Sequence, residues 1–429
     1  MSKRYQRSEE LLEVALKTIP LGSQTFSKSK TQFPYGASPF FMSKGKGSHV
    51  WDVDGNEYID FINSLAAVTL GYNDDDVTLA VKEQLEQGVL FSLPHPIEMK
   101  VAEKICEMVP CAEMVRFGKN GSDATSAAVR LARAYTGCDH IIVCGYHGWQ
   151  DWYIGSTARG LGVPQSTKDL THAFAYNDLD SLRELFNKWP DQIAAVIMEP
   201  MNVVEPQAGF LNGVKEIAHD NGALLVFDET ITGFRFSNGG AQELFGVIPD
   251  LATFGKGIAN GFAVSAVTGK KDIMKLMEDI FFSSTFAGET ISLAASLATM
   301  NKLQQEPVIE TMTKQGEKII KFLRDLITKS DAEHIFSISG HPVWSFLLIN
   351  DIAPYTQWQI KTLFMQEMLA RGILTLGTHN MSYSHSDRDL DVLFEVYREV
   401  IPLLVKAIQE NTLEKLLHCQ VLEPLFKVR

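Results

Sequence analysis

Two residues of opposite charge follow two short apolar runs in the segment 223–261 of this 429-residue chain. Asp228 comes after the run 224–227, and Lys256 follows the run 251–254 after a single glycine. Short apolar runs bounded by turn residues are typical of buried strands, and open α/β sheets collect ligands at the carboxyl ends of such strands. An amine and an acid held there are what a pyridoxal-phosphate site requires, because the amine forms a Schiff base with the cofactor and the acid keeps its pyridine nitrogen protonated.

A turn suited to an anion lies upstream, in the segment 117–124, Phe-Gly-Lys-Asn-Gly-Ser-Asp-Ala. Gly121 and Ser122 fall where the first N–H groups of a predicted helix are free to bind a phosphate. The segment has neither the GxxxxGK[ST] pattern of a Walker loop nor the GxGxxG pattern of a dinucleotide turn. Taken alone, these residues are better explained by a simple N-cap role for Ser122 or Asp123.

Further candidate residues follow two other predicted strands. Tyr146, His147 and Trp149 come after the apolar run 141–144, and Glu199 ends the run 194–198 before a proline. An aromatic ring or an imidazole at a strand end is able to cover one face of a flat cofactor. Taken alone, such a residue is more often a core or rim residue without a cofactor role. Glu199 would orient a side chain or the substrate, or be a solvated loop carboxylate. Together with the acid, the amine and the anion-binding turn, these residues converge on one edge of one predicted sheet.

The elements that must position these residues form an α/β pattern. From about residue 75, helical and strand patterns alternate, which predicts a mostly parallel sheet with helices on both faces. An amphipathic helix at 7–19 and a hairpin around an Asp-Gly turn at 48–61 come first. We expect helices at 75–87, 98–109, 122–136, 211–221, 290–303, 307–329 and 386–410, and further strands at 113–117, 140–144, 193–198, 346–349 and 373–376. The predicted domains are an arm and hairpin at 1–70 that form part of a small domain, a large cofactor-binding domain at 71–306, and a C-terminal α+β domain at 307–429.

The composition excludes several other kinds of partner. A net charge of −13 argues against nucleic-acid binding, which usually needs a basic face. The five cysteines form no CxxC pair, so we expect no metal site. No apolar run approaches the roughly 20 residues of a membrane span, and the charged N-terminus is not followed by the apolar region of a signal peptide. A cytoplasmic protein without a membrane partner is therefore expected.

Several motifs resemble those of class III aminotransferases, which are fold-type I pyridoxal-phosphate enzymes. The segment 226–235, Val-Phe-Asp-Glu-Thr-Ile-Thr-Gly-Phe-Arg, resembles the family's DE-x-x-TGFR signature, and 251–257 resembles its lysine strand. Three more segments follow the family order: Asn-Gly-Ser-Asp-Ala at 120–124 is similar to its SGTEA phosphate loop, Tyr-His-Gly at 146–148 to its YHG motif, and Thr-Phe-Ala-Gly at 285–288 to its TF-x-G loop. With Trp-Asp-Val-Asp-Gly at 51–55, the resemblance covers nearly the whole chain, and the glutamate-1-semialdehyde aminomutases and their aminotransferase neighbours are most similar.

The resemblance implies a large domain with a seven-stranded, mostly parallel sheet and a smaller α+β domain built from the N- and C-terminal segments. It also implies a role for each motif residue. Lys256 would bind pyridoxal 5'-phosphate covalently and then move the proton, while Asp228 would pair with the pyridine nitrogen. The other implied cofactor contacts are Gly121 and Ser122 at the phosphate, Tyr146 on the ring, and His147, Glu199 and Thr230. Thr285 would reach the phosphate of the partner's cofactor across a dimer interface, so a homodimer with a shared active site is expected.

The departures from the family concern the substrate side. Lys28 stands where the aminomutases carry an arginine for the substrate carboxylate, and lysine lacks the bidentate fork of arginine. The aminomutase tryptophan is replaced by the segment 62–66, and Glu-Thr at 289–290 replaces the usual Asn-Pro. Predicted substrate contacts are Lys28, Ser64, Trp149 and Asn380. A pocket lined by Asn63, Ser64, Thr378, His379 and Asn380 would suit a polyhydroxylated carbonyl compound.

The expected function is transfer of an amino group between an amino donor, such as glutamate, and a carbonyl compound, such as a sugar derivative. Two alternatives stay open. One is a different reaction on the same cofactor, such as the intramolecular transfer of glutamate-1-semialdehyde 2,1-aminomutase or a decarboxylation. The other is a non-catalytic relative that serves as a binding protein, which retention of Lys256, Asp228, the phosphate turn and Thr285 together disfavours.

Overall fold

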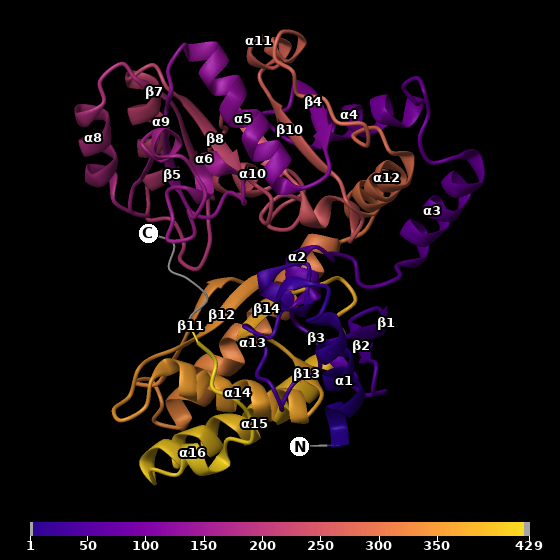
Figure 1. The fold of residues 1–429 in the computed structure, drawn as a ribbon, viewed down its shortest axis with the longest axis vertical. Coiled ribbons are helices and arrows are strands. Elements are labelled where there is room, and N and C mark those ends of the chain that lie inside the picture. Colours follow the sequence, from indigo (N-terminus) through magenta and orange to yellow (C-terminus); the bar gives the residue numbers. More distant parts are fainter. Residues whose placement is uncertain (1–2, 424–429) are drawn as a thin grey trace. The chain divides into compact units, whose positions relative to one another are not determined.

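The computed structural model describes residues 3–423, which divide into two compact units (Figure 1). Within that range, the smaller unit comprises residues 3–66, 70–74 and 310–423, and the larger unit comprises 67–69 and 75–309. No helix in residues 3–423 is long and apolar enough to cross a membrane. The expected cytoplasmic location stays a prediction.

The larger unit is built on a seven-stranded sheet with the order β4-β10-β9-β8-β7-β5-β6. Only β10 runs against its neighbours, so β4, β9, β8, β7, β5 and β6 all end at the same edge. This confirms the predicted mostly parallel sheet. The strands are β4 (Met114–Gly118), β5 (His140–Cys144), β6 (Thr171–Ala173), β7 (Ile193–Met198), β8 (Leu224–Asp228), β9 (Leu251–Phe254) and β10 (Ser265–Gly269).

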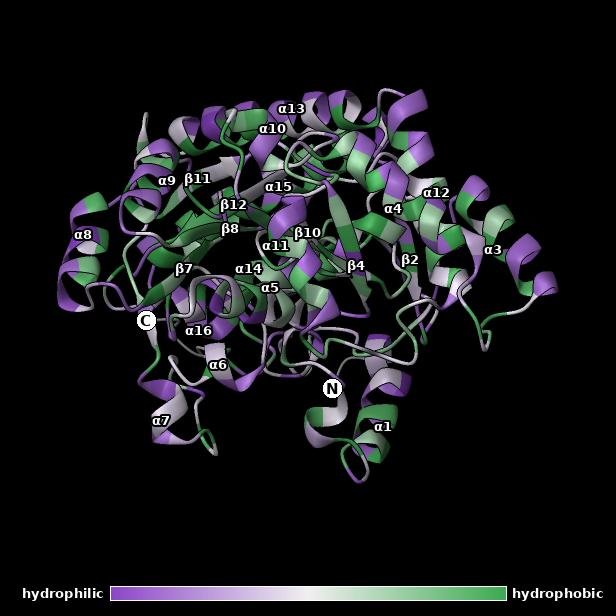
Figure 2. Cartoon of the chain, turned by 90° about the horizontal axis from the view of Figure 1, so that it is seen from above, coloured by the Kyte–Doolittle hydropathy of each residue, from purple (hydrophilic) through white to green (hydrophobic). Residues whose placement is uncertain are grey.

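Alternating strand residues pack on the two faces of this sheet. On β8, Leu224 and Val226 belong to the apolar cluster that includes helix α5 (Gly121–Thr136). Leu225 and Phe227 belong to the cluster that includes α8 (Leu179–Lys188) and α9 (Phe210–Asp220). Because successive strand residues point to opposite faces, a strand that is apolar throughout needs helices on both sides. Figure 2 shows the hydrophobic residues concentrated in strands such as β7 and β8.

The helices of the larger unit surround the sheet at its faces and edges (Figure 1). They are α3 (Asp75–Gln87), α4 (Pro96–Met108), α5 (Gly121–Thr136), α6 (Asp151–Ile154), α7 (Gln165–Lys168), α8 (Leu179–Lys188), α9 (Phe210–Asp220), α10 (Ala241–Phe245), η4 (Lys256–Ala259), α11 (Lys271–Met274), η5 (Lys275–Glu278) and α12 (Thr290–Gln305). Four buried alanines of α5 (Ala124, Ala127, Ala128 and Ala132) let that helix approach the sheet closely.

The smaller unit contains two sheets, and its hairpin confirms the sequence prediction. Strands β2 and β3 pair antiparallel around the Asp-Gly turn, and β13 adds to β3 in parallel. The first sheet has the order β1-β2-β3-β13 and the second the order β11-β12-β14. The strands are β1 (Met42–Lys46), β2 (His49–Asp52), β3 (Glu57–Asp60), β11 (Phe336–His341), β12 (Trp344–Ile349), β13 (Ile373–Leu374) and β14 (Thr378–Asn380). The helices are η1 (Lys3–Tyr5), α1 (Gln6–Ala15), η2 (Pro20–Gly22), η3 (Phe26–Lys28), α2 (Asn63–Ala66), most of α13 (Val308–Lys329), α14 (Gln357–Ala370), α15 (Asp387–Gln409) and α16 (Leu413–Leu416).

The short element α2 has a left-handed backbone. Its four residues have φ angles of 45°, 51°, 62° and 64°, although none of them is glycine. Each such residue costs about 1–2 kcal/mol, so the surrounding structure must hold the turn in place. Asp60 accepts hydrogen bonds from the Ile62 and Asn63 amides, and the Asn63 side chain donates to the Asn380 carbonyl.

Candidate active site

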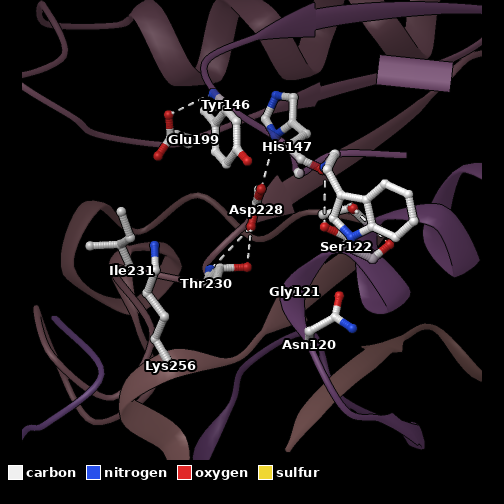
Figure 3. A pocket seen from close by; sticks show the side chains of 13 residues that line it. Asn120, Gly121, Ser122, Tyr146, His147, Glu199, Asp228, Thr230, Ile231 and Lys256 are labelled. Carbon is white, nitrogen blue, oxygen red and sulfur yellow. Dashed lines mark hydrogen bonds and ion pairs between the residues drawn. The ribbon is translucent and has the colours of Figure 1, made fainter. Parts of the chain in front are cut away.

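A cavity of about 270 Å³ lies at the carboxyl edge of the large sheet, where the sequence predicted a site (Figure 3). Residues that follow β4, β5, β7, β8 and β9 contribute to it because these strands end at the same edge. The lining residues are Asn120, Gly121, Ser122, Thr125, Tyr146, His147, Gly148, Trp149, Glu199, Asp228, Thr230, Ile231 and Lys256. Nine of the thirteen residues predicted to contact the cofactor or the substrate line this cavity, and the other four are Lys28, Ser64, Asn380 and Thr285.

Lys256 supplies the amine of this cavity. It opens η4 one glycine after the end of β9 and has a φ of 42°, a left-handed conformation that a non-glycine residue adopts at a cost of about 1–3 kcal/mol. In Figure 3 its amine points into the same cavity as the carboxylate of Asp228. Burial lowers the pKa of Lys256, against the opposing effect of the Glu199 and Asp228 carboxylates. A lowered pKa increases the fraction of free amine, which is the nucleophilic form.

Asp228 is buried at the end of β8 and is fully hydrogen-bonded. His147 Nδ1 donates to Asp228 Oδ2 at 2.9 Å, and Oδ1 accepts from the Thr230 amide (3.1 Å), the Thr230 hydroxyl (2.6 Å) and the Thr253 hydroxyl (3.1 Å). Burial alone would raise the pKa of Asp228, but the hydrogen bonds from His147 and Thr230 bring it below its ordinary value. The carboxylate is therefore ionised at neutral pH and able to stabilise a positive charge.

Glu199 is also buried, which excludes the solvated loop carboxylate. Its Oε2 accepts from the Tyr146 amide at 3.0 Å and from the Asn202 side chain at 2.8 Å. Gly145 makes room for this carboxylate, since it has a φ of 110° and a Cβ there would lie 2.4 Å from Glu199 Oε2. Burial and the neighbouring Asp228 charge raise the pKa of Glu199.

The turn before α5 has the geometry of an anion site. Asn120 is the N-cap of this 16-residue helix and forms a reciprocal capping box with Asp123, so the cap is not Ser122. Gly121 and Ser122 occupy the first helical positions, where free amides and the helix dipole favour a negative charge. A Cβ on Gly121 would lie 3.0 Å from Thr230 Cγ2, so glycine keeps this wall of the cavity open.

Two aromatic residues form the exposed rim of the cavity. The side chains of Tyr146 and Trp149 are 46% and 63% exposed, and the Trp149 amide donates to Ser122 Oγ at 3.2 Å. The Tyr146 ring meets Tyr153 edge-on, with 5.6 Å between centroids. The rim therefore presents two rings to a ligand in the cavity.

Thr285 does not line this cavity. It lies in an exposed loop that borders a second cavity, of about 580 Å³, beside the edge strand β4. Phe286 in the same loop is 57% exposed, and Phe91 and Leu93 on the facing loop are 46% and 79% exposed. Large apolar side chains gathered in this way are typical of a protein interface.

The remaining predicted substrate residues belong to the smaller unit. Lys28 Nζ donates to Ser64 Oγ at 3.1 Å, which brings these two together. The Asn380 side chain donates to the Ile62 carbonyl at 2.6 Å and supports the left-handed α2.

Three residues of the expected polar pocket, Asn63, His379 and Asn380, are buried, and His379 is not available to a ligand. His379 is fully buried, and its two ring nitrogens lie 3.0 Å from Ser345 Oγ and 2.8 Å from Tyr397 Oη. The physical reason is that β14 pairs with β12, which places this side chain in the core of the smaller unit. The expectation that His379 lines a pocket was therefore wrong.

Four contributing residues were not predicted from the sequence. Thr125 and Ile231 line the cavity, Asn202 holds Glu199, and Thr253 holds Asp228. Thr253 is the only polar residue in the apolar run 251–254, and that exception was the available signal. Asn202 and Ile231 lie in turns, where no periodic pattern marks them.

The cavity fits pyridoxal phosphate. A partly buried lysine, an ionised aspartate and a helix N-terminus are present at one sheet edge, and the Nε2 of buried His147 has no hydrogen-bond partner among the described residues. Within residues 3–423, no three His, Cys, Asp or Glu side chains are grouped so as to hold a metal ion.

Comparisons with known proteins agree with this chemistry. Residues 32–386 match the family model described as aminotransferase class-III. The chain is 34% identical to a 3-aminobutyryl-CoA aminotransferase of Cloacimonas acidaminovorans, over 94% of this chain and 99% of that protein. It is 35% identical to a glutamate-1-semialdehyde 2,1-aminomutase of Syntrophobacter fumaroxidans, over 91% and 96%. The FumI protein of Sphingopyxis sp. MTA144, solved with PLP, superposes with a TM-score of 0.87 at 27% identity and covers 97% of this chain and 99% of its own.

The family match covers most of the chain, and the structural similarity extends over both units. These findings confirm the predicted fold type and cofactor. The chain belongs to the class III aminotransferases and is a pyridoxal-phosphate-dependent enzyme with the fold-type I architecture.

Proposed function

We propose that this enzyme is an aminotransferase that moves an amino group from an amino acid, such as glutamate, to a carbonyl acceptor. The observation that carries the proposal is the shared cavity of Lys256, the Asp228–His147 pair and the start of α5. An amine, a paired acid and an anion site are the three contacts that the cofactor needs. A non-catalytic relative that served only as a binding protein would not require the paired acid.

Each residue then has a proposed task. Lys256 holds the cofactor covalently, and its released amine moves a proton at the substrate carbon. Asp228, oriented by His147, holds the proton of the pyridine nitrogen. When bound, pyridoxal phosphate supplies an electron sink for the carbanion of the substrate. The remaining cofactor contacts are Gly121, Ser122 and Thr230 at the phosphate, Tyr146 over the ring, and Glu199 beside its edge.

The proposed acceptor is a polyhydroxylated carbonyl compound, such as a keto- or aldehyde-sugar. Ser64 and Thr378 are partly exposed and neutral, and they support this class, whereas the buried His379 does not contribute. A 3-oxo acyl compound is the second acceptor class. It is supported by the 34% identity to an enzyme named for 3-aminobutyryl-CoA.

Intramolecular transfer is the second candidate function. The 35% identity to a glutamate-1-semialdehyde aminomutase favours it. The loss of the aminomutase arginine and tryptophan, at Lys28 and in 62–66, favours the aminotransferase. Dependence on an external acceptor separates the two reactions.

We further propose that the enzyme is a homodimer with shared active sites. Thr285 lies in an exposed loop outside the cavity of its own chain, and exposed apolar side chains surround it. A second copy placed on this surface would cover those side chains and bring Thr285 to the phosphate of the partner's cofactor. An isolated protomer would then have an incomplete phosphate site.

A screen of donors against acceptors tests the proposed reaction. The purified enzyme with added pyridoxal phosphate is given glutamate and other amino acids, each with a keto-sugar, an aldehyde-sugar or a 3-oxo acid, and aminated products are measured by mass spectrometry. Lys256→Ala is the control without the reactive amine. We expect amination that requires both partners. Turnover of glutamate-1-semialdehyde alone, without any external acceptor, would contradict the proposal.

A further inference from the structure

An ion pair joins two loops of the larger unit that are far apart in the sequence. Lys119 Nζ lies 2.9 Å from Glu289 Oε2 and donates a longer hydrogen bond, 3.4 Å, to Ser292 Oγ. The Lys119 and Glu289 side chains are 22% and 14% exposed. Since water screens such a mostly buried pair less than a surface pair, it is able to hold the two loops together.

Each partner of the pair is fixed on its own side. The Lys119 amide donates to Asp123 Oδ2 at 2.9 Å, the same oxygen that closes the capping box of α5. Glu289 accepts from the Ile291 and Ser292 amides and so caps α12. Burial alone would raise the pKa of Glu289, but hydrogen bonds from Ser292 and Lys119 bring it below its ordinary value.

The two loops carry different parts of the proposed active site. Lys119 directly precedes Asn120 and Gly121, which line the Lys256 cavity. Glu289 directly follows the loop 281–288, whose tip exposes Thr285. The base of that loop approaches α4 closely, because a Cβ on Gly288 would lie 2.8 Å from Glu98 Cδ. The ion pair is therefore positioned to set the Thr285 loop relative to the phosphate turn of the same chain.

We propose that Lys119 and Glu289 are positioning residues that couple the two cofactor sites of a dimer. Within one chain, the pair connects the phosphate turn to the Thr285 loop. The phosphate turn serves the cofactor of the same chain, whereas the Thr285 loop serves the cofactor of the partner. Cofactor affinity at each site then depends on the ion pairs of both chains. This inference rests on the proposed shared site. An asparagine at 289, as in the relatives with Asn-Pro there, would offer no charge to Lys119.

The direction in which Glu289→Gln changes cofactor affinity distinguishes a positioning role from a purely electrostatic one. Glu289→Gln removes a negative charge near a site for a phosphate, so electrostatics alone would tighten cofactor binding. If the pair positions the loop, the same substitution weakens binding. Lys119→Met should also weaken binding, and Lys119→Arg should restore it because the charge returns.

The test is a titration of the full-length apoprotein with pyridoxal phosphate, followed by its visible absorption. We expect Glu289→Gln and Lys119→Met to raise the dissociation constant about fivefold, and Lys119→Arg to stay close to the wild type. Lys318→Met, which breaks the Lys318–Asp387 ion pair of the smaller unit, is the matched control and should change nothing. An unchanged or lowered dissociation constant for Glu289→Gln would overturn the inference, as would a lowered unfolding temperature without any change in affinity.

A combination with Thr285→Ala separates this inference from the proposed function. If the pair acts by placing Thr285, Lys119→Met raises the dissociation constant of pyridoxal phosphate by less than about twofold when Thr285 is already replaced by alanine. If the double variant shows the product of the two single-variant changes in the dissociation constant, the positioning role is overturned. An unchanged affinity in Thr285→Ala itself would contradict the shared site, whereas weakened binding in Thr285→Ala with none in Glu289→Gln would contradict only the ion-pair inference.

Discussion

At the residue scale, the buried Asp228 carboxylate governs how well the cofactor accepts electrons. Asp228→Asn keeps the shape of the side chain but removes the charge that holds the pyridine proton. We predict that the rate of the first half-reaction falls at least about 100-fold, as for loss of other proton-holding groups. The measurement is a single-turnover experiment with the best donor from the screen.

Thr253→Val is the matched control for this substitution. It removes one of the four hydrogen bonds to Asp228 and leaves the carboxylate in place. We predict a loss of only about tenfold, because one hydrogen bond to a charged group contributes about 1.5–3 kcal/mol and three others still hold the carboxylate. Equal losses in both variants, or full activity in Asp228→Asn, would contradict the role given to the charge.

The sequence was sufficient to predict the site residues that directly follow apolar strands. Lys256, Asp228 and Glu199 stand out because a charged residue ends a buried run. Residues held only by contacts distant in sequence were not predictable in this way. Thr253 stands out in its apolar run, but its partner Asp228 follows only from the pairing of β8 with β9. His379 was wrongly placed because its burial depends on the pairing of β14 with β12.

At the element scale, the left-handed α2 should respond to glycine in the opposite way from an ordinary helix. Ala66 and Ala128 are both buried, but Ala66 has a φ of 64° and Ala128 lies within α5. We predict that Ala66→Gly stabilises the protein by about 1 kcal/mol, because glycine adopts positive φ without strain. Ala128→Gly should destabilise by about 1 kcal/mol.

Denaturant unfolding of the two variants checks this pair. The same side-chain change is made in both, so the opposite signs isolate the backbone conformation. Destabilisation of similar size in both variants would mean that α2 carries no strain from its left-handed backbone.

The strands β2 and β3 and helix α15 meet at a pH-sensitive cluster. His49 lies 2.8 Å from Glu57 and 3.0 Å from Asp389. The hydrogen bond with Asp389 is the main cause of the raised pKa of His49. A raised folded-state pKa means that this stabilisation is complete below the unfolded value of about 6.5 and is lost as pH rises through the folded value.

We predict that His49→Gln destabilises the protein more at about pH 5.5 than at about pH 9. The difference should be about 1 kcal/mol, because His49 is one-third exposed and solvent screens its charge. Unfolding temperatures of both proteins at the two pH values measure it. A loss of stability that does not change with pH would contradict a charged His49.

Several helices and strands were predicted closely, whereas the helices α8 and α14 and the short or weakly apolar strands were missed. The helix expected at 75–87 is α3, and the strands expected at 140–144 and 193–198 are β5 and β7. The strand β6 has three residues, and β10 contains Ser, Thr and Gly, so neither shows an apolar run. The left-handed α2 was not predictable, since long-range hydrogen bonds hold a backbone that its residues do not favour.

At the scale of the whole molecule, the proposed shared site predicts complementation between two defective chains. A Lys256→Ala chain retains Thr285, and a Thr285→Ala chain retains Lys256. In a mixed dimer, one site combines the intact residue of each chain. Random reassembly of equal amounts should therefore recover up to about one quarter of the wild-type activity.

The measurement is activity before and after subunit exchange, followed over time. Each variant incubated alone is the control, since it must not gain activity. A mixture that forms mixed dimers but shows no gain would mean that each site lies within one chain.

The central claim is that Lys256 holds pyridoxal phosphate and releases it to an amino donor. The most direct test reduces the purified holoenzyme with borohydride and measures, by peptide mass spectrometry, the fraction of Lys256 that carries the cofactor. We predict nearly complete labelling of Lys256, its loss after an amino donor is added, and its return after the carbonyl acceptor is added. Labelling of a different lysine, or labelling of Lys256 that donor and acceptor leave unchanged, would contradict the account.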